Sequence, residues 1–230
     1  MEGIIMQLPK YTVYRCKRKS IRLVLKANGT FAVYCPKRCP VKDIEEVLAN
    51  HCEEMQKSFY QRQDKLFCDE NGTETLPLLG HRYPLVRTDK KRFVFDGSRF
   101  LTPTYNQEEI RRLYRELLRK KAKDMIPCIA RELSDKFNLP FSGLTVKAIY
   151  SRYGSCSSRK HLNFSLALMA FDIEFIRFVV SHELCHTVYM NHSSDFYALL
   201  DKVYPEHRKV KSEGAAERSA IFKAIHFSPA

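Results

Sequence analysis

The residues best able to do chemistry are His182, Glu183, His186 and His192, near the C-terminal end of the sequence. Residues four apart on a helix lie one turn apart on the same face, so the imidazoles of His182 and His186 can bind one metal ion. Glu183 is rotated about a quarter of a turn away and can instead act on a water as general base. His192 is the third candidate ligand, or alternatively a residue that precedes a helix starting at Ser193. The spacing predicts a zinc-dependent hydrolase.

These residues lie in a strongly apolar segment, residues 172–189. Its core candidates are Phe175, Ile176, Val179, Val180 and Leu184. Ionisable side chains on a largely buried helix are costly unless they are paired or coordinate a metal. We therefore expect a mononuclear zinc hydrolase with one Zn²⁺ per chain. Zinc lowers the pKa of a bound water, Glu183 removes the proton, and the hydroxide attacks a peptide carbonyl.

The net charge of +13 favours acidic partners such as nucleic acid or nucleotide phosphates, and it keeps two other functions open. One is a metal-dependent phosphohydrolase acting on nucleotides, although the sequence contains no GxxxxGK[ST] phosphate loop. The other is a DNA-associated protease, or a nucleic-acid-binding module that carries the zinc site. The basic residues at 111–123 are interleaved with acids, which favours a solvated helix face over a nucleic-acid groove. Lys17-Arg18-Lys19 and Lys90-Lys91-Arg92 are interpreted as turns and strand edges.

Composition is typical of an ordinary globular protein, with 44% hydrophobic and 28% charged residues among 230. That length fits one large domain or two small ones. We find no apolar run of the length of a membrane span and no signal-peptide pattern at the N-terminus, so we expect a cytoplasmic protein without membrane contacts. The eight cysteines include no CxxC pair and are expected to be free thiols.

The order of elements predicts an α+β fold with a boundary near Thr104. Residues 1–104 are expected to form a β-rich module with one helix at about 41–65; its strands are expected at 11–15, 21–25, 31–34, 81–87, 92–95 and 99–102. Ala27-Asn28-Gly29-Thr30 predicts a hairpin turn. Residues 105–230 are expected to form the catalytic half.

The expected catalytic half begins with a long helical pattern from Asn106 to about Phe137. Pro127 lies within it and indicates either a kink or two helices that meet. Strands are expected at 144–150 and 161–165 on either side of a polar turn at 154–158. The metal-binding helix and a helix at 193–203 follow. The tail from Glu206 is charged, and its last residues are uninformative.

Several motifs resemble the YgjP-like metallopeptidase family, within the zincin group that also includes SprT-like proteases. The specific ones are Arg152-Tyr153-Gly154-Ser155-Cys156-Ser157-Ser158, Leu162-Asn163, Val179-Val180-Ser181-His182-Glu183-Leu184-Cys185-His186 and Asn191-His192-Ser193-Ser194-Asp195-Phe196. The resemblance implies a zincin-like catalytic half with a small sheet and a metal-binding helix. It also implies that His182, His186 and His192 are the ligands and Glu183 is the base. Tyr153 is a departure, because Trp is more usual there. Tyr189 departs from the metzincin pattern, which has Gly at that position.

Further site residues are predicted by position. The strand at 161–165 and the turn before it form either a plain hairpin or an edge to which an extended peptide substrate adds. Gly154, Ser155 and Asn163 are accordingly the candidates for substrate binding. A group that stabilises the oxyanion is also expected, and its candidates are Tyr204, His207 and Arg208.

Overall fold

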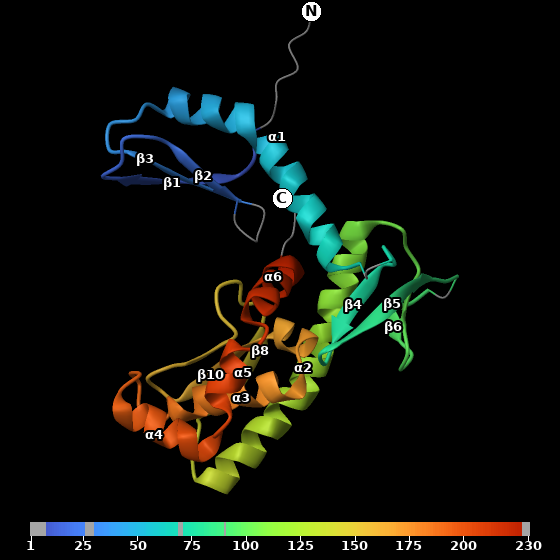
Figure 1. Ribbon diagram of the computed structural model, residues 1–230, viewed down its shortest axis with the longest axis vertical. Helices are drawn as coiled ribbons and strands as arrows, with labels where there is room; N and C mark the ends of the chain where they lie inside the picture. The colour runs from blue at the N-terminus through green and yellow to red at the C-terminus, as the bar shows by residue number, and fades with distance from the viewer. Residues whose placement is uncertain (1–7, 26–29, 69–70, 90, 227–230) are drawn as a thin grey trace, which may run out of the picture. The chain divides into compact units, whose positions relative to one another are not determined.

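The computed structural model describes residues 8–25, 30–68, 71–89 and 91–226, and over these ranges the protein has the expected α+β fold (Figure 1). The chain divides into two compact units: one holds the described residues up to Leu66, and the other runs from Phe67 to His226. The domain boundary predicted near Thr104 falls inside the second unit and stays a prediction. The turn predicted at 27–30 falls largely outside the described residues, as does the start of the chain. None of the described helices is long and apolar enough to span a bilayer.

The first unit is a three-stranded sheet with one helix. Its strands are β1 (Tyr11–Cys16), β2 (Arg22–Leu25) and β3 (Phe31–Pro36), and its helix is α1 (Val41–Leu66). The sheet order is β1-β3-β2, with β3 parallel to β1 and antiparallel to β2. Alternate residues of β3 pack with one face of α1 in a small core, which contains Phe31, Val33, Cys35, Cys39, Ile44, Leu48 and Cys52.

The second unit begins with a four-stranded sheet of order β4-β5-β7-β6. Its strands are β4 (Thr75–Leu78), β5 (His81–Arg87), β6 (Val94–Phe95) and β7 (Phe100–Thr102). β4 was not predicted; it is a short, fully buried strand that contains Pro77 and lacks the alternation of a half-buried strand.

Helix α2 (Gln107–Phe137) is the long helix of the second unit. Asn106 caps its first turn by accepting a hydrogen bond from the backbone N–H of Glu109, and Asn138 ends it in the left-handed conformation with φ 52°. The helix continues through Pro127 as one element, so the alternative of two helices meeting there is wrong. Tertiary packing outweighs the missing hydrogen bond, because Ile126, Ile129 and their neighbours on this face are buried.

A second sheet of this unit, of order β8-β10-β9, contacts the helix at 173–185. Its strands are β8 (Gly143–Lys147), β9 (Gly154–Cys156) and β10 (His161–Ser165). The interpretation of residues 154–158 as a turn is wrong for the first three, because β9 pairs antiparallel with β10. Glycine and serine have low strand propensity, and this pairing between distant residues overrides it. β8 and β9 are therefore the edge strands. The alternative that the strand at 161–165 is an edge is wrong, because β10 pairs with a strand on each side.

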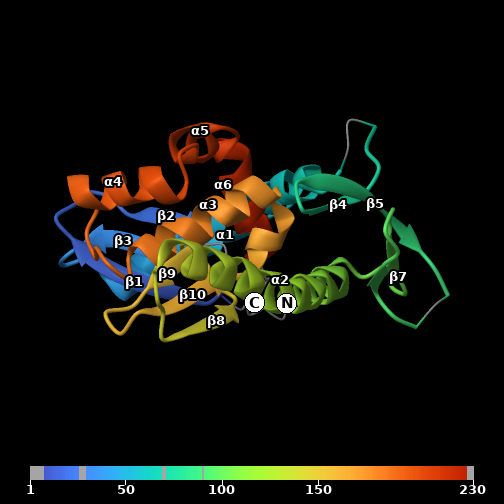
Figure 2. The same ribbon diagram turned by 90° about the horizontal axis from the view of Figure 1, so that it is seen from below.

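Helix α3 (Ile173–Cys185) follows the short 3-10 helix η1 (Leu166–Ala170). In Figure 2, α3 lies between α2 and α4 (Ser194–Val203), and it also contacts β9 and α5 (His207–Ser212). The charged tail from Glu206, to which the sequence assigned no element, contains α5 and then α6 (Ala215–His226). Helix α6 packs on η1 and buries three apolar side chains in the core, namely Ile221, Phe222 and Ile225. Their spacing at positions i, i+1 and i+4 is helical, although the surrounding charges obscure the pattern.

Candidate metal centre

The first two candidate ligands lie at the C-terminal end of α3: His182 is in its last turn, and His186 is its C-cap residue. Asp172 caps its N-terminus by accepting a hydrogen bond of 2.7 Å from the backbone N–H of Phe175. The five core candidates of this helix are all buried, as predicted from their spacing. The helix ends at Cys185, and the chain then turns over residues 186–188 and bends at Met190 and Asn191. This turn brings His192 back to the helix without the glycine that the metzincin pattern has at position 189.

The three imidazoles converge. Nε2 of His182 lies 3.2 Å from Nε2 of His186 and 3.1 Å from Nε2 of His192. One nitrogen from each of the three rings lies within 4.8 Å of the others. Three nitrogens bound tetrahedrally to one Zn²⁺, at Zn–N distances of about 2.0–2.1 Å, stand about 3.3 Å apart. The spacing of these nitrogens therefore fits a single small cation of this kind.

The orientation of His186 is fixed by contacts behind the site. Its Nδ1 lies 2.8 Å from the backbone carbonyl of Tyr189, which makes Nδ1–H the donor and leaves Nε2 as a ligand. The ring of Phe196, from α4, stacks on His186 with 4.6 Å between centroids. The same ring meets His182 at 5.0 Å and His192 at 4.9 Å. Phe196 is fully buried, so one apolar side chain supports all three imidazoles.

The electrostatics of the cluster favour neutral rings. Burial, together with the smaller effect of the neighbouring His186 and His192, lowers the pKa of His182 to about 3. Burial also lowers the pKa of His186, against a raising effect of the hydrogen bond to Tyr189. A neutral imidazole is the form that binds a metal ion. The imidazoles of His182 and His186 are therefore neutral at neutral pH and available to bind a metal ion.

The side chain of Glu183, on α3, packs against β9. Its side chain is buried, and burial raises the pKa of its carboxyl to about 7, while Arg152 and a hydrogen bond from the backbone N–H of Cys156 act in the opposite direction. Gly154 leaves the space that the carboxyl group fills, because a Cβ at residue 154 would stand 2.8 Å from Cγ of Glu183. A carboxyl group with a pKa near neutrality can both accept and return a proton.

A cavity of about 480 Å³ opens over these residues. Residues 151–156 form one side of it, and α3 with the segment up to His192 forms the other. Arg152 lies on the rim, exposed to solvent. Among the residues that the structure describes, Arg152 makes no ion pair, although its charge acts on Glu183. Sequence reasoning missed Arg152 as a site residue; its position directly before Tyr153-Gly154-Ser155, in a motif already singled out, was the available signal.

The predicted substrate-binding residues lie at different depths. Gly154 and Ser155 line the cavity on β9. Asn163 lies on the central strand β10, where its backbone partner is Ser155, and it does not line the cavity. Tyr153, the departure from the usual Trp, packs edge-on against a cluster of phenylalanines: Phe171, Phe175 and Phe222.

None of the three predicted oxyanion-stabilising residues lines this cavity. The hydroxyl of Tyr204 donates to the carboxylate of Glu174 at 2.5 Å. His207 is buried, with Nε2 2.8 Å from Oδ1 of Asp201, and Arg208 is 79% exposed. Their role in oxyanion stabilisation stays a prediction.

Comparison with known proteins gives the family. Two solved structures are similar over 40% of this chain: the metallopeptidase zymogens of Pyrococcus abyssi abylysin (17% identity, 93% of that chain, TM-score 0.37) and Methanocaldococcus jannaschii jannalysin (22% identity, 94% of that chain, TM-score 0.36). No curated protein matched the sequence. The profile of the YgjP-like metallopeptidase domain matches residues 19–213, most of the chain. The protein therefore belongs to the YgjP-like family of metallopeptidase domains, and at the level of this family it is a metal-dependent peptidase.

Proposed function

We propose that this protein is a zinc-dependent peptidase, with one Zn²⁺ per chain held by His182, His186 and His192, and with Glu183 as the general base. The observation that carries the proposal is the convergence of three ring nitrogens beside a buried carboxyl group at the floor of an open cavity. Three histidines leave a fourth coordination position open, which is the arrangement of catalytic zinc sites. When bound, zinc lowers the pKa of a water molecule and polarises the scissile carbonyl.

The protein's own residues supply the proton transfers. Glu183 accepts a proton from the attacking water as general base and returns it to the leaving amine as general acid. Gly154 and the backbone N–H of Cys156 fix the position of Glu183 from one side. The wall formed by Tyr153, Gly154 and Phe178 limits the access of other water to it.

The exposed edge of β9 is the proposed binding place for the substrate backbone. β9 is the outer strand of its sheet and pairs only with β10 among the described strands. A peptide in extended conformation adds to such an edge through main-chain hydrogen bonds. Gly154 and Ser155 would make these contacts along the cavity. Asn163 stays a candidate through its pairing with Ser155.

Arg152 is the group that we propose for stabilising charge on the carbonyl oxygen. It lines the cavity close enough for its charge to act on Glu183, and a guanidinium remains cationic throughout the reaction. Preorganised cationic donors directed at a developing oxyanion are among the strongest catalytic contributions. Tyr204, His207 and Arg208 remain the alternatives proposed from sequence.

The glutamine variant of Glu183 tests this function. Glu183→Gln keeps the size of the side chain and removes the base, so the variant should retain its zinc and lose peptide turnover by at least about a hundred-fold. The substrates should be a casein and peptide panel beside a nucleoside triphosphate panel. Peptide cleavage by the wild type, abolished in the variant, supports the proposal. Phosphate release without peptide cleavage would point to the phosphohydrolase alternative, and unchanged turnover in the variant would remove Glu183 from the mechanism.

A further inference from the structure

A cluster of positive charge lies at one end of the sheet in the first unit. β1 ends where β2 begins, because β3 is parallel to β1 and antiparallel to β2. The segment from Arg15 to Arg22 at this end contains five basic residues and no acid: Arg15, Lys17, Arg18, Lys19 and Arg22. All five are exposed to solvent. None forms an ion pair with a residue that the structure describes.

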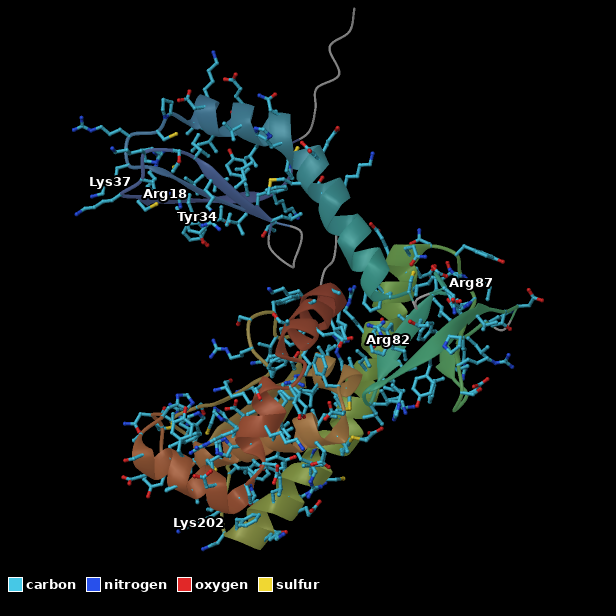
Figure 3. The ribbon with its side chains drawn as sticks, in the orientation of Figure 1. Arg18, Tyr34, Lys37, Arg82, Arg87 and Lys202 are labelled. Carbon is cyan, nitrogen blue, oxygen red and sulfur yellow. The ribbon has the colours of Figure 1, made fainter. Side chains whose placement is uncertain are left out.

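The loop after β3 adds further basic residues at the same end. β3 ends at Pro36, beside the end of β1 at Cys16, and is followed by Lys37 and Arg38. Figure 3 shows Lys37 and Arg18 together at this end of the sheet. The loop is ordered, since the guanidinium of Arg15 donates to the backbone carbonyls of Lys37 at 3.1 Å and Cys39 at 2.7 Å. We call Arg15, Lys17, Arg18, Lys19, Arg22, Lys37 and Arg38 the basic end.

A pair of stacked tyrosines continues from the basic end onto the sheet. Tyr14 and Tyr34 are register partners on β1 and β3, and their rings stack with 5.0 Å between centroids and 19° between planes. Arg22 on β2 is the next register partner in the same row. Tyr14 is 40% exposed. The row therefore presents aromatic and guanidinium groups across three strands.

This row lies on the face of the sheet turned away from α1. Phe31, Val33 and Cys35 point into the core shared with α1, so Tyr34, between Val33 and Cys35, points to the opposite side. Figure 3 shows Tyr34 on the side of the sheet away from that helix. A β-sheet face that carries an exposed tyrosine stacked on a half-buried one, beside a basic rim, has the two features that single-stranded nucleic acids need. The cations pair with phosphates and the rings stack with bases.

We propose that this face of the first unit binds single-stranded nucleic acid, with the phosphates along the basic end and bases on the Tyr14–Tyr34 pair. The proposal concerns a different surface from the metal centre and does not depend on peptidase activity. A single strand is favoured over a duplex because only unpaired bases can stack on a protein ring. An anionic membrane, which attracts the same basic residues, is the alternative partner that the test separates.

The test measures the binding of the full chain to labelled oligo-U and oligo-dT by fluorescence anisotropy at several salt concentrations. The oligonucleotides are about 12 nucleotides long, which is within the usual site sizes. If about four phosphates are neutralised, log Kobs should fall against log salt with a slope of about −3. Lys17→Glu/Lys19→Glu should raise Kd at least about ten-fold. The matched control Lys120→Glu/Lys123→Glu, with the same change of charge on exposed positions of α2, should change Kd by less than about two-fold.

The ring contribution is tested by two substitutions at one position. Tyr14→Ala should raise Kd about ten-fold, whereas Tyr14→Phe keeps the ring and should stay within about two-fold of the wild type. Circular dichroism and thermal melting establish that each variant is folded. Equal effects of Tyr14→Ala and Tyr14→Phe would overturn the stacking contact. Duplex of the same length bound as tightly as the single strand, or anionic vesicles bound while oligonucleotides are not, would overturn the proposal as a whole.

Discussion

Gly154 lies so close to Glu183 that a Cβ at residue 154 would stand 2.8 Å from Cγ and 2.9 Å from Oε1 of the glutamate. Real Cβ atoms do not approach other heavy atoms this closely, so any side chain at 154 must displace the carboxyl group. The contact joins β9 to α3, and both residues line the cavity. It explains in physical terms why a glycine stands inside a strand, where glycine has a low propensity.

Gly154→Ala is therefore expected to lower kcat by about ten-fold or more while the zinc content stays at the wild-type level. The added methyl group moves Glu183 and leaves the three imidazoles in place, and small displacements of a catalytic group are costly. Steady-state kinetics together with metal analysis of the same sample make the measurement. Wild-type kcat in the alanine variant would show that the carboxyl group needs no such space.

Phe196→Leu should weaken metal binding. The buried ring of Phe196 contacts all three imidazoles at 4.6–5.0 Å, so a smaller and differently shaped side chain lets the ligands rotate. We expect zinc affinity to fall by about ten-fold, the lower end of the effect seen when groups that orient ligands are changed. Competition with a chromophoric chelator measures it. Phe178→Leu, at another ring that contacts His182, is the matched control and should have the smaller effect.

Arg152→Gln and Tyr204→Phe separate the candidates for oxyanion stabilisation. Because Arg152 lines the cavity, its loss should lower kcat/KM by about ten-fold or more. The Tyr204 hydroxyl bonds Glu174, so Tyr204→Phe should lower the free energy of unfolding by about 1 kcal/mol and change kcat/KM much less. If Tyr204→Phe costs more turnover than Arg152→Gln, the candidate proposed from sequence is the better one.

Glu74 gives the stability of the second unit an acid dependence. Its hydrogen bond with Arg87 lowers the pKa of the Glu74 carboxyl, and a second bond from Gln107 at 2.6 Å acts in the same direction. A lowered pKa means that the stabilisation is present above the ordinary value of about 4.5 and is lost as pH falls below it. These groups are partly exposed, so the contribution is at most about 1 kcal/mol.

Glu74→Gln should accordingly lower Tm by about 2–4 °C at pH 7, and the difference from the wild type should close below about pH 4. Thermal melts from pH 3 to pH 7 test both statements. Glu54→Gln, at an exposed position of α1, is the control and should show no such difference. A gap that stays constant down to pH 3 would mean that the carboxylate charge contributes nothing.

Helix α3 and the placing of His182 and His186 on one side of it could be predicted from sequence, because helical spacing fixes which side chains share a face. His182 and His186 needed only the i,i+4 relationship, and the core residues of the same helix followed from the apolar period. The long helix from Gln107 was predicted for the same reason. Its passage through Pro127 could not be, since whether the helix continues there depends on packing partners that lie far away in the sequence.

Pairings between distant residues were the hardest to foresee. β9 consists of Gly154, Ser155 and Cys156, which indicate a turn by propensity, and only its pairing with β10 makes it a strand. Helix α6 was missed because its apolar residues are few among charges, although they complete the core. The place of Arg152 at the cavity could not be predicted either, because it depends on recognising β9, the strand that Arg152 precedes.

Zinc binding by the three histidines is tested most directly by the zinc content of His192→Ala beside the wild type. The content is measured by mass spectrometry after both proteins are exchanged into metal-free buffer. His192 lies beyond the turn that follows His186, the C-cap residue of α3, so its contribution depends on the folded turn and not on helical spacing. The account predicts one zinc per chain in the wild type and a large loss of zinc in the variant. A full equivalent of zinc retained by His192→Ala, with turnover unchanged, would contradict it.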